Sequence, residues 1–107
     1  MRSHEWIDQR SLALDRLIAG KLSARPELLQ QALRTLDRWI ADRQPDPPPV
    51  LLEWLAILRS RSLMEILDLL RGDTEEARRL RQSSPFCGIL SEEERLEVFR
   101  EYETART

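Results

Sequence analysis

The chain has 107 residues, of which 41% are hydrophobic and 34% are charged, and its formal net charge is −2. This length is enough for one domain, and no apolar run approaches the roughly 18 residues needed to span a membrane. The single cysteine excludes a disulfide framework and a cysteine-rich metal site. Because the amino terminus is polar and lacks the apolar stretch of a signal peptide, we expect a cytoplasmic protein.

Two amphipathic stretches open the chain. Apolar residues recur at three- and four-residue steps from His4 to Leu22 and predict a first helix. Pro26 fits the first position of a second helix, whose apolar stripe ends near Arg43. The residues expected on the inner faces are Trp6, Ile7, Ala13, Leu14, Leu17, Ile18 and Leu22 in the first helix, and Leu28, Leu29, Ala32, Leu33, Leu36, Trp39 and Ile40 in the second.

A proline-rich connector follows at residues 44–49 (Gln-Pro-Asp-Pro-Pro-Pro). It cannot be helical before its last proline, because each proline biases the preceding residue toward extended geometry. Neither side alone has enough residues to bury a sizeable core, so we interpret this segment as a stiff connector within one domain. Residues 50–58 are almost all apolar, and their leucine content favours a helix. A helix that is apolar on all sides should be the central one or should leave a face for a partner.

Polar clusters predict the starts of three further helices. Ser62 and Glu65 have the spacing of a capping box, and Gly72 marks the end of the helix that they open. Residues 73–76 open a short helix, and residues 91–94 open the last one. The inner residues of these three helices are expected to be Leu63, Ile66, Leu67 and Leu70, then Ala77 and Leu80, then Leu96, Phe99 and Tyr102.

A loop at residues 83–90 separates the last two helices, and its apolar residues should tuck into the core. Cys87, between Phe86 and Gly88, is expected to be a small buried hydrophobe. No stretch alternates polar and apolar residues as a strand does. The sequence therefore predicts an all-α fold: a compact bundle of five or six short helices that forms a single domain over residues 1–107.

Charged residues are unevenly distributed in the second half of the chain. Residues 59–81 hold six arginines against five acidic residues, whereas residues 91–103 hold six glutamates against two arginines. The two segments are able to pair with each other, and we expect Glu75 to pair with Arg78 or Arg79 at helical spacing. Arginine suits interfaces, although a high-GC genome produces the same bias. The negative net charge is not typical of a protein that binds DNA.

Residue types needed for catalysis and metal binding are scarce. His4 is the only histidine and Cys87 the only thiol, so a nucleophile has no base near it in the sequence. Three glycines supply no phosphate-binding loop. We therefore expect no enzymatic activity, no catalytic residue, no cofactor and no metal. The three tryptophans are typical of a core, with an interface anchor as the alternative for one of them.

A helix-turn-helix motif would have its turn at Gly72. The residues flanking this glycine are charged, and Arg78 and Arg81 fall where the second helix of that motif needs apolar residues. The DNA-reading version of the motif is therefore disfavoured.

Two stretches resemble parts of small, mostly uncharacterised bacterial proteins. They are residues 6–14 (WIDQRSLAL) and residues 80–90 (LRQSSPFCGIL), the second followed by Glu93-Glu94-Arg95. The Ser-Ser-Pro-Phe-x-Gly-x-Leu loop is the more specific part, and small residues are usual where Cys87 stands. The resemblance extends over most of the chain, and these proteins look like antitoxin components of bacterial toxin–antitoxin pairs. It implies binding rather than catalysis, and it transfers no site residue.

Together these observations predict an antitoxin-like protein-interaction module that binds and masks a partner protein, such as a toxin encoded by a neighbouring gene. Its acidic last helix would occupy a basic, nucleic-acid-binding groove of that partner. The expected partner-binding residues are Arg78, Arg79, Arg81, Phe86, Glu97, Glu101 and Tyr102. The alternatives are a DNA-binding transcriptional regulator that uses the Arg59–Arg81 segment, a small enzyme built around Cys87, and an assembly subunit. The leucine content also allows a homo-oligomer.

Overall fold

The computed structural model describes residues 4–106, with side chains over residues 6–103, and is all-α. Within this range there are six α-helices, one short 3-10 helix and no strand, which confirms the predicted helical bundle. The elements are α1 (His4–Ala24), η1 (Pro26–Leu28), α2 (Leu29–Asp42), α3 (Pro49–Ser60), α4 (Leu63–Arg71), α5 (Glu75–Arg81) and α6 (Glu92–Arg106). None of the helices in the described range is long and apolar enough to cross a membrane.

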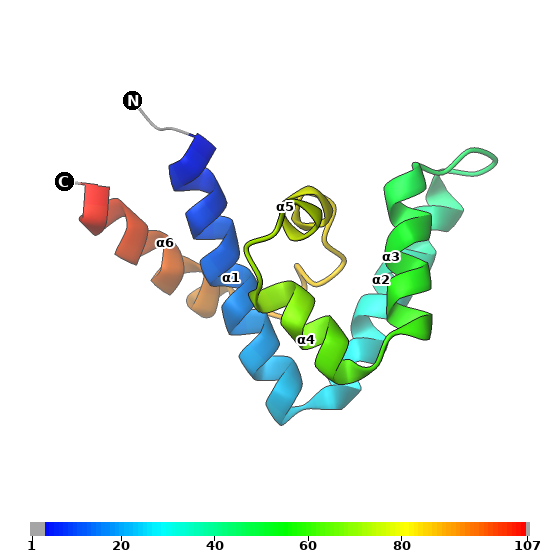
Figure 1. The fold of residues 1–107 in the computed structure, drawn as a ribbon, viewed down its shortest axis with the longest axis horizontal. Helices are drawn as coiled ribbons and strands as arrows, with labels where there is room; N and C mark the ends of the chain where they lie inside the picture. The colour runs from blue at the N-terminus through cyan, green and yellow to red at the C-terminus, as the bar shows by residue number, and fades with distance from the viewer. Residues whose placement is uncertain (1–3, 107) are drawn as a thin grey trace.

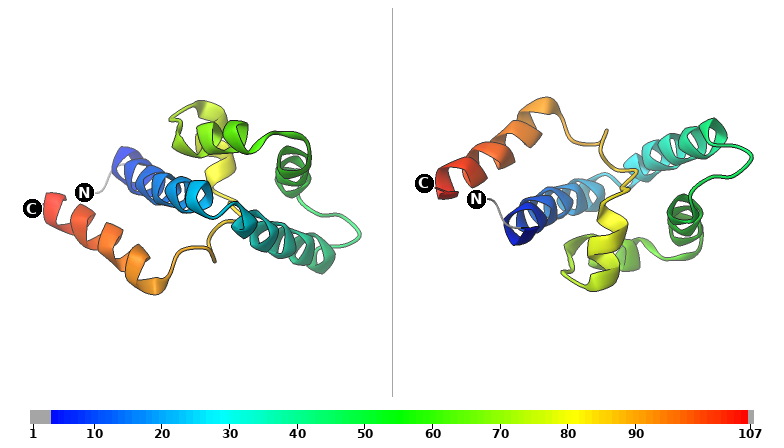
Figure 2. Two further views of the ribbon diagram at one scale, coloured as in Figure 1. Left: turned by 90° about the horizontal axis from the view of Figure 1, so that it is seen from below. Right: turned by 90° about the horizontal axis from the view of Figure 1, so that it is seen from above.

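The helices are arranged around α1. In Figure 1, α1 and α2 form a V with η1 at its apex, α3 runs alongside α2, and α5 lies in the opening of the V. Figure 2 shows α4 and α5 on one side of α1 and α6 on the other, with the end of α6 near the start of α1. The molecule measures 45 × 31 × 25 Å along its principal axes. α1 is therefore the central helix, because α4, α5 and α6 all pack against it.

The most apolar helix, α3, is not the central one. It packs chiefly against α2 at one edge of the molecule, with Trp54 1% exposed and Leu52 47% exposed. The sequence allowed this helix either to be central or to leave a face for a partner. In the structure α3 is not central, and one of its faces is uncovered.

Contacts on two sides of α1 explain an error in its predicted stripe. Ile7 and Leu17 were expected to face inward but are exposed, whereas Leu12 and Ala19 are buried. A helix covered from two directions buries residues around much of its circumference, so a single apolar stripe is a poor guide to its contacts.

Local signals in the sequence are confirmed at the helix starts. Ser62 Oγ accepts a hydrogen bond from the Glu65 amide (3.2 Å), and the Ser62 amide donates to Glu65 Oε1 (3.0 Å), which completes the capping box. Ser91 and Glu94 form the same reciprocal pair at the start of α6, at 3.1 and 2.7 Å. At α5, Thr74 is the N-cap, and its hydroxyl accepts from the amide of the third helical residue at 3.0 Å.

The 83–90 loop tucks into the core as predicted. Phe86 is fully buried and meets the Trp54 ring edge-on at a centroid distance of 5.7 Å. The prediction that Cys87 is buried is wrong, because its side chain is exposed. The Ile89 amide donates to the Phe86 carbonyl at 3.0 Å and closes a turn. The two ends of this turn, Phe86 and Ile89, point into the core, so Cys87 between them points outward.

Candidate functional site

The arginines of α5 bind acidic side chains of this chain. Arg79 donates two parallel hydrogen bonds to the carboxylate of Glu53 on α3, both at 2.7 Å. This pairing lowers the pKa of Glu53. Arg78 donates to Asp73 at 2.9 Å. The expected pairing of Glu75 with Arg78 or Arg79 is therefore wrong, because Asp73 in the preceding turn and Glu53 on α3 take those positions.

Arg81 lies inside the molecule. Its Nε donates to Asp15 Oδ2 on α1 at 3.0 Å, and its Nη2 donates to the Gly72 carbonyl at 2.9 Å. The two charged side chains are only 5% and 8% exposed. Burial raises the pKa of Asp15 to about 6, because the lost hydration of the carboxylate outweighs the attraction of Arg81. Arg81 thus joins α5 to α1 and is not offered to a partner.

Phe86 also lies away from the surface. Its side chain is completely enclosed, so it holds the 83–90 loop in place rather than presenting a contact to another protein. Of the seven predicted partner-binding residues, Arg78, Arg79, Glu97, Glu101 and Tyr102 keep at least part of their surface accessible.

The predicted residues of α6 fall on two faces of that helix. Glu97 and Glu101, one turn apart, are exposed on the outer side. Tyr102 faces α1, where its hydroxyl donates to the Gln9 carbonyl at 3.1 Å. Its ring meets Trp6 edge-on, with the centroids 6.3 Å apart. The structure therefore brings the two glutamates together and assigns Tyr102 to the contact between α6 and α1.

An arginine between two aromatic rings reinforces that contact. The Arg10 guanidinium carbon lies 5.1 Å from the Trp6 ring centroid and 4.7 Å from the Phe99 ring centroid. A guanidinium over an aromatic face is attracted by the negative face of the ring. This arrangement, together with Tyr102, fixes the carboxyl-terminal half of α6 on α1.

Lys21 fixes the other end of α6. Its ammonium donates to Glu94 Oε1 at 2.6 Å and to the Ile89 carbonyl at 2.9 Å. The same Glu94 closes the capping box with Ser91. The Lys21 ammonium and the Ser91 amide together lower the pKa of Glu94 to about 2. The position of α6 on α1 is therefore set at both ends.

The exposed face of α6 carries several glutamates, with Leu96 and Arg100 among them. Leu96, which the sequence placed inside, is 42% exposed, and Val98 is buried in its place at 7% exposed. The exposed glutamates around this leucine form no ion pair with any side chain within residues 6–103; they are Glu92, Glu93, Glu97 and Glu101. We call Leu96 and these four glutamates the outer acidic face.

The basic and acidic segments do not pair with each other. The ion pairs made by arginines of residues 59–81 lead to Asp15, Glu53, Asp73 and Glu76, none of which is on α6. The two segments thus remain electrostatically separate. Glu92, Glu93, Glu97 and Glu101 are consequently available to another molecule.

Two important residues were missed in the sequence, although each left a signal. Asp15 lies three residues after Leu12 and three before Ile18, so this acidic residue shares a helix face with two apolar residues. Arg10 follows Trp6 by four residues, the spacing at which side chains on one helix face meet. An acid or a cation at such a position indicates an internal partner.

Comparison with models of known families, with curated proteins and with solved structures finds no match to this chain. Within the side chains of residues 6–103, no three histidine, cysteine or acidic residues are grouped so that they could hold a metal ion.

Proposed function

We propose that this protein is a cytoplasmic, antitoxin-like interaction module that binds and masks a basic partner protein through the outer acidic face. The observation that carries this proposal is the set of exposed glutamates on α6 that have no ion pair within residues 6–103. The resemblance of the 83–90 loop and the 6–14 segment to antitoxin components points to the same class of function.

Electrostatics favours a basic surface as the target. Glu97 and Glu101 lie one turn apart on the same helix, and like charges at this spacing repel each other by about 0.2–0.5 kcal/mol. A positively charged partner would relieve this repulsion and would raise the association rate by steering. Leu96 at the centre of the face supplies an apolar contact that such an interface can bury.

The contacts of α6 with α1 suit a binding helix. A helix docked in advance loses less conformational entropy on binding than a disordered segment would. Lys21 and Arg10, both on α1, contact Glu94 and Phe99 on the inner side of α6. The outer glutamates are therefore presented on a helix that is already oriented.

DNA binding through the Arg59–Arg81 segment has less support. Phosphate binding needs available cations, and Arg61, Arg78, Arg79 and Arg81 are all engaged with acidic side chains of this chain. A regulator would need to break several of these pairs or to use other arginines.

Co-expression with the product of the neighbouring gene tests the proposal. We expect a stoichiometric complex in size-exclusion chromatography with light scattering, and relief of the growth arrest that the partner causes alone. A monomer or homodimer without a co-eluting protein would contradict the masking role. A shift of the upstream DNA in a low-salt gel assay, with no protein complex, would favour the regulator instead.

A further inference from the structure

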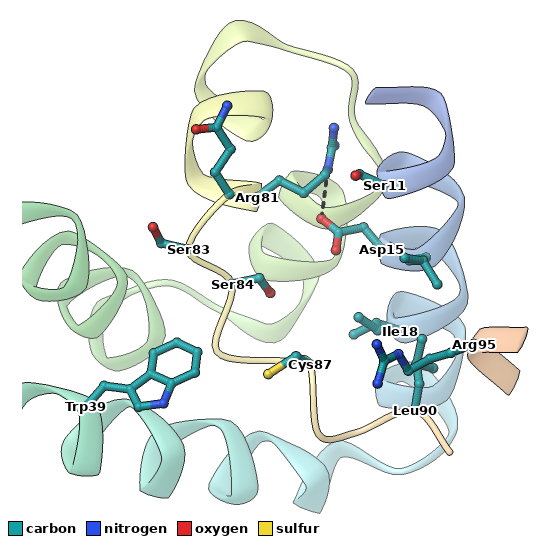
Figure 3. Close-up of a pocket in the computed structure, with 12 residues that line it drawn as sticks. Ser11, Asp15, Ile18, Trp39, Arg81, Ser83, Ser84, Cys87, Leu90 and Arg95 are labelled. Atoms are coloured by element: carbon teal, nitrogen blue, oxygen red, sulfur yellow. Dashed lines mark hydrogen bonds and ion pairs between the residues drawn. The ribbon is translucent and has the colours of Figure 1, made fainter. Parts of the chain in front are cut away.

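A pocket of about 370 Å³ lies between α1 and the 83–90 loop, and Arg95 of α6 belongs to its lining. Its volume is within the range of roughly 300–1,000 Å³ that is usual for small-molecule sites. Figure 3 shows Asp15 reaching into it from α1, with Ser84 and Cys87 opposite on the loop and Trp39 of α2 at its far side. Arg95, at the start of α6, points into the pocket from below Asp15.

Asp15 is the unusual group in this pocket. The residue is 6% exposed, and its Oδ2 accepts from Arg81. Its other carboxylate oxygen accepts no hydrogen bond from side chains or backbone of the described residues, and Figure 3 shows it directed into the pocket. This oxygen is open to the pocket rather than enclosed, so it offers a charged acceptor to a donor from outside the chain.

The other residues that line the pocket indicate what kind of molecule carries that donor. Leu14, Ile18, Leu90 and the half-buried Trp39 form an apolar wall that suits a hydrocarbon or aromatic body. Arg95 is exposed and has no ion pair within residues 6–103, so it favours an anionic group at the mouth.

We propose that this pocket binds a small zwitterion with an apolar body, of the size of an apolar amino acid. Its ammonium donates to the open oxygen of Asp15, its carboxylate faces Arg95, and its side chain packs against the apolar wall and Trp39. The site is separate from the outer acidic face, so its occupancy and the binding of a partner protein are tested independently.

Three related probes separate the two polar contacts. L-phenylalanine carries both charged groups, 2-phenylethylamine lacks the carboxylate, and 3-phenylpropionate lacks the amine. In an NMR titration of the wild-type chain, we expect L-phenylalanine to bind with a Kd on the order of 1 mM. The chemical shifts should change at the Trp39 indole and at the amides of Ser84 and Cys87. The acid without an amine should bind about tenfold more weakly.

Variants assign these contacts to residues. Asp15→Asn should weaken L-phenylalanine binding about tenfold, whereas Asp37→Asn, an exposed carboxylate on α2, should leave it unchanged. Arg95→Gln should remove the preference for L-phenylalanine over 2-phenylethylamine. This second comparison does not depend on Asp15→Asn being folded, because Arg95 is exposed.

Two results would overturn the proposal. One is the absence of localised shifts with all three probes, and the other is equal binding of 3-phenylpropionate and L-phenylalanine. An unchanged preference for the zwitterion in Arg95→Gln would contradict the assignment of the carboxylate to Arg95.

Discussion

The two sides of α1 are held by different chemistry. On one side, α4 and α5 bury apolar side chains such as Leu70, and a buried ion pair joins Asp15 to Arg81. On the other side, α6 is held by Arg10 between two aromatic rings and by a half-buried ion pair between Lys21 and Glu94. The first side resembles a domain core and the second resembles a protein–protein interface. This difference indicates that the stability of the fold resides with α4 and α5, whereas α6 is the helix to which the proposed function assigns recognition.

The largest expected effect is on the core side. Leu70→Ala removes a side chain that is 1% exposed and should destabilise the fold by about 2–5 kcal/mol. Val98→Ala on α6 should cost about 1.5 kcal/mol, because it deletes less apolar surface. Urea unfolding followed by circular dichroism measures both. Leu52→Ala, at an exposed position, is the control and should change the free energy of unfolding by less than about 0.5 kcal/mol. A cost of less than about 1.5 kcal/mol for Leu70→Ala would contradict the assignment of the core to the side of α4 and α5.

The second largest change in the free energy of unfolding is expected from loss of the Arg10 guanidinium between the two rings. Arg10→Met keeps an apolar chain of similar length but removes the charge that lies over Trp6 and Phe99. We expect a loss of about 1–2 kcal/mol in the same urea experiment. Arg34→Met on the exposed surface of α2 is the matched control, because no hydrogen bond or ion pair of its side chain lies within residues 6–103. If Arg10→Met leaves the free energy of unfolding unchanged, the aromatic rings alone hold α6.

The buried acid gives the core side a characteristic pH dependence. Because the pKa of Asp15 is raised from 3.8 to about 6, the native state holds its proton more tightly than the unfolded state does. This contribution to stability is complete below pH 3.8 and is lost as the pH rises through 6. Between pH 7.5 and 5.5 the wild-type chain should gain about 1 kcal/mol relative to Asp15→Asn. If the two chains respond equally to pH in urea unfolding, Asp15 does not titrate in this range.

The smallest effect concerns the half-buried ion pair between Lys21 and Glu94 on the α6 side. Lys21→Met removes the ammonium that lowers the pKa of Glu94 to about 2, so this pKa should rise toward its ordinary value of 4.5. In the wild type, the stabilisation from this pair is present above pH 4.5 and is lost as the pH falls through 2, the opposite direction to Asp15. An NMR titration of the Glu94 carboxyl carbon measures the change. A pKa that stays near 2 in Lys21→Met would assign the shift to Ser91 alone.

Local features of this fold are readable from the sequence, and its packing is not. The capping pairs at Ser62 and Ser91 and the helix start at Pro49 depend on neighbours within a few residues, so the pattern contains all the information. The central position of α1 depends on contacts with α4 and α6, which come much later in the chain. The apolar composition of α3 allowed either a central helix or a helix with an uncovered face, and only its tertiary contacts decide between them.

The candidate site shows the same division. Glu97 and Glu101, predicted as partner-binding residues of an acidic helix, are exposed, and their binding of a partner stays a prediction. The interior position of Arg81 was not predicted, because it depends on a distant partner, Asp15. The burial of the loop that holds Phe86 was predicted from its apolar residues, but a Phe86 enclosed against Trp54 is not the partner contact that was also expected of it. A sequence pattern lists charged and aromatic residues, but only tertiary contacts decide which of them remain available.

The most direct test of the proposed recognition role compares two double charge reversals. Glu97→Lys with Glu101→Lys and Asp37→Lys with Asp46→Lys change the net charge equally, but only the first pair alters the outer acidic face. The affinity for the partner obtained by co-expression is measured for both, at low and at physiological salt. We predict at least a tenfold loss and a weaker salt dependence for the α6 pair, with little change for the control pair. Equal affinities of the two variants would contradict the role of the outer acidic face.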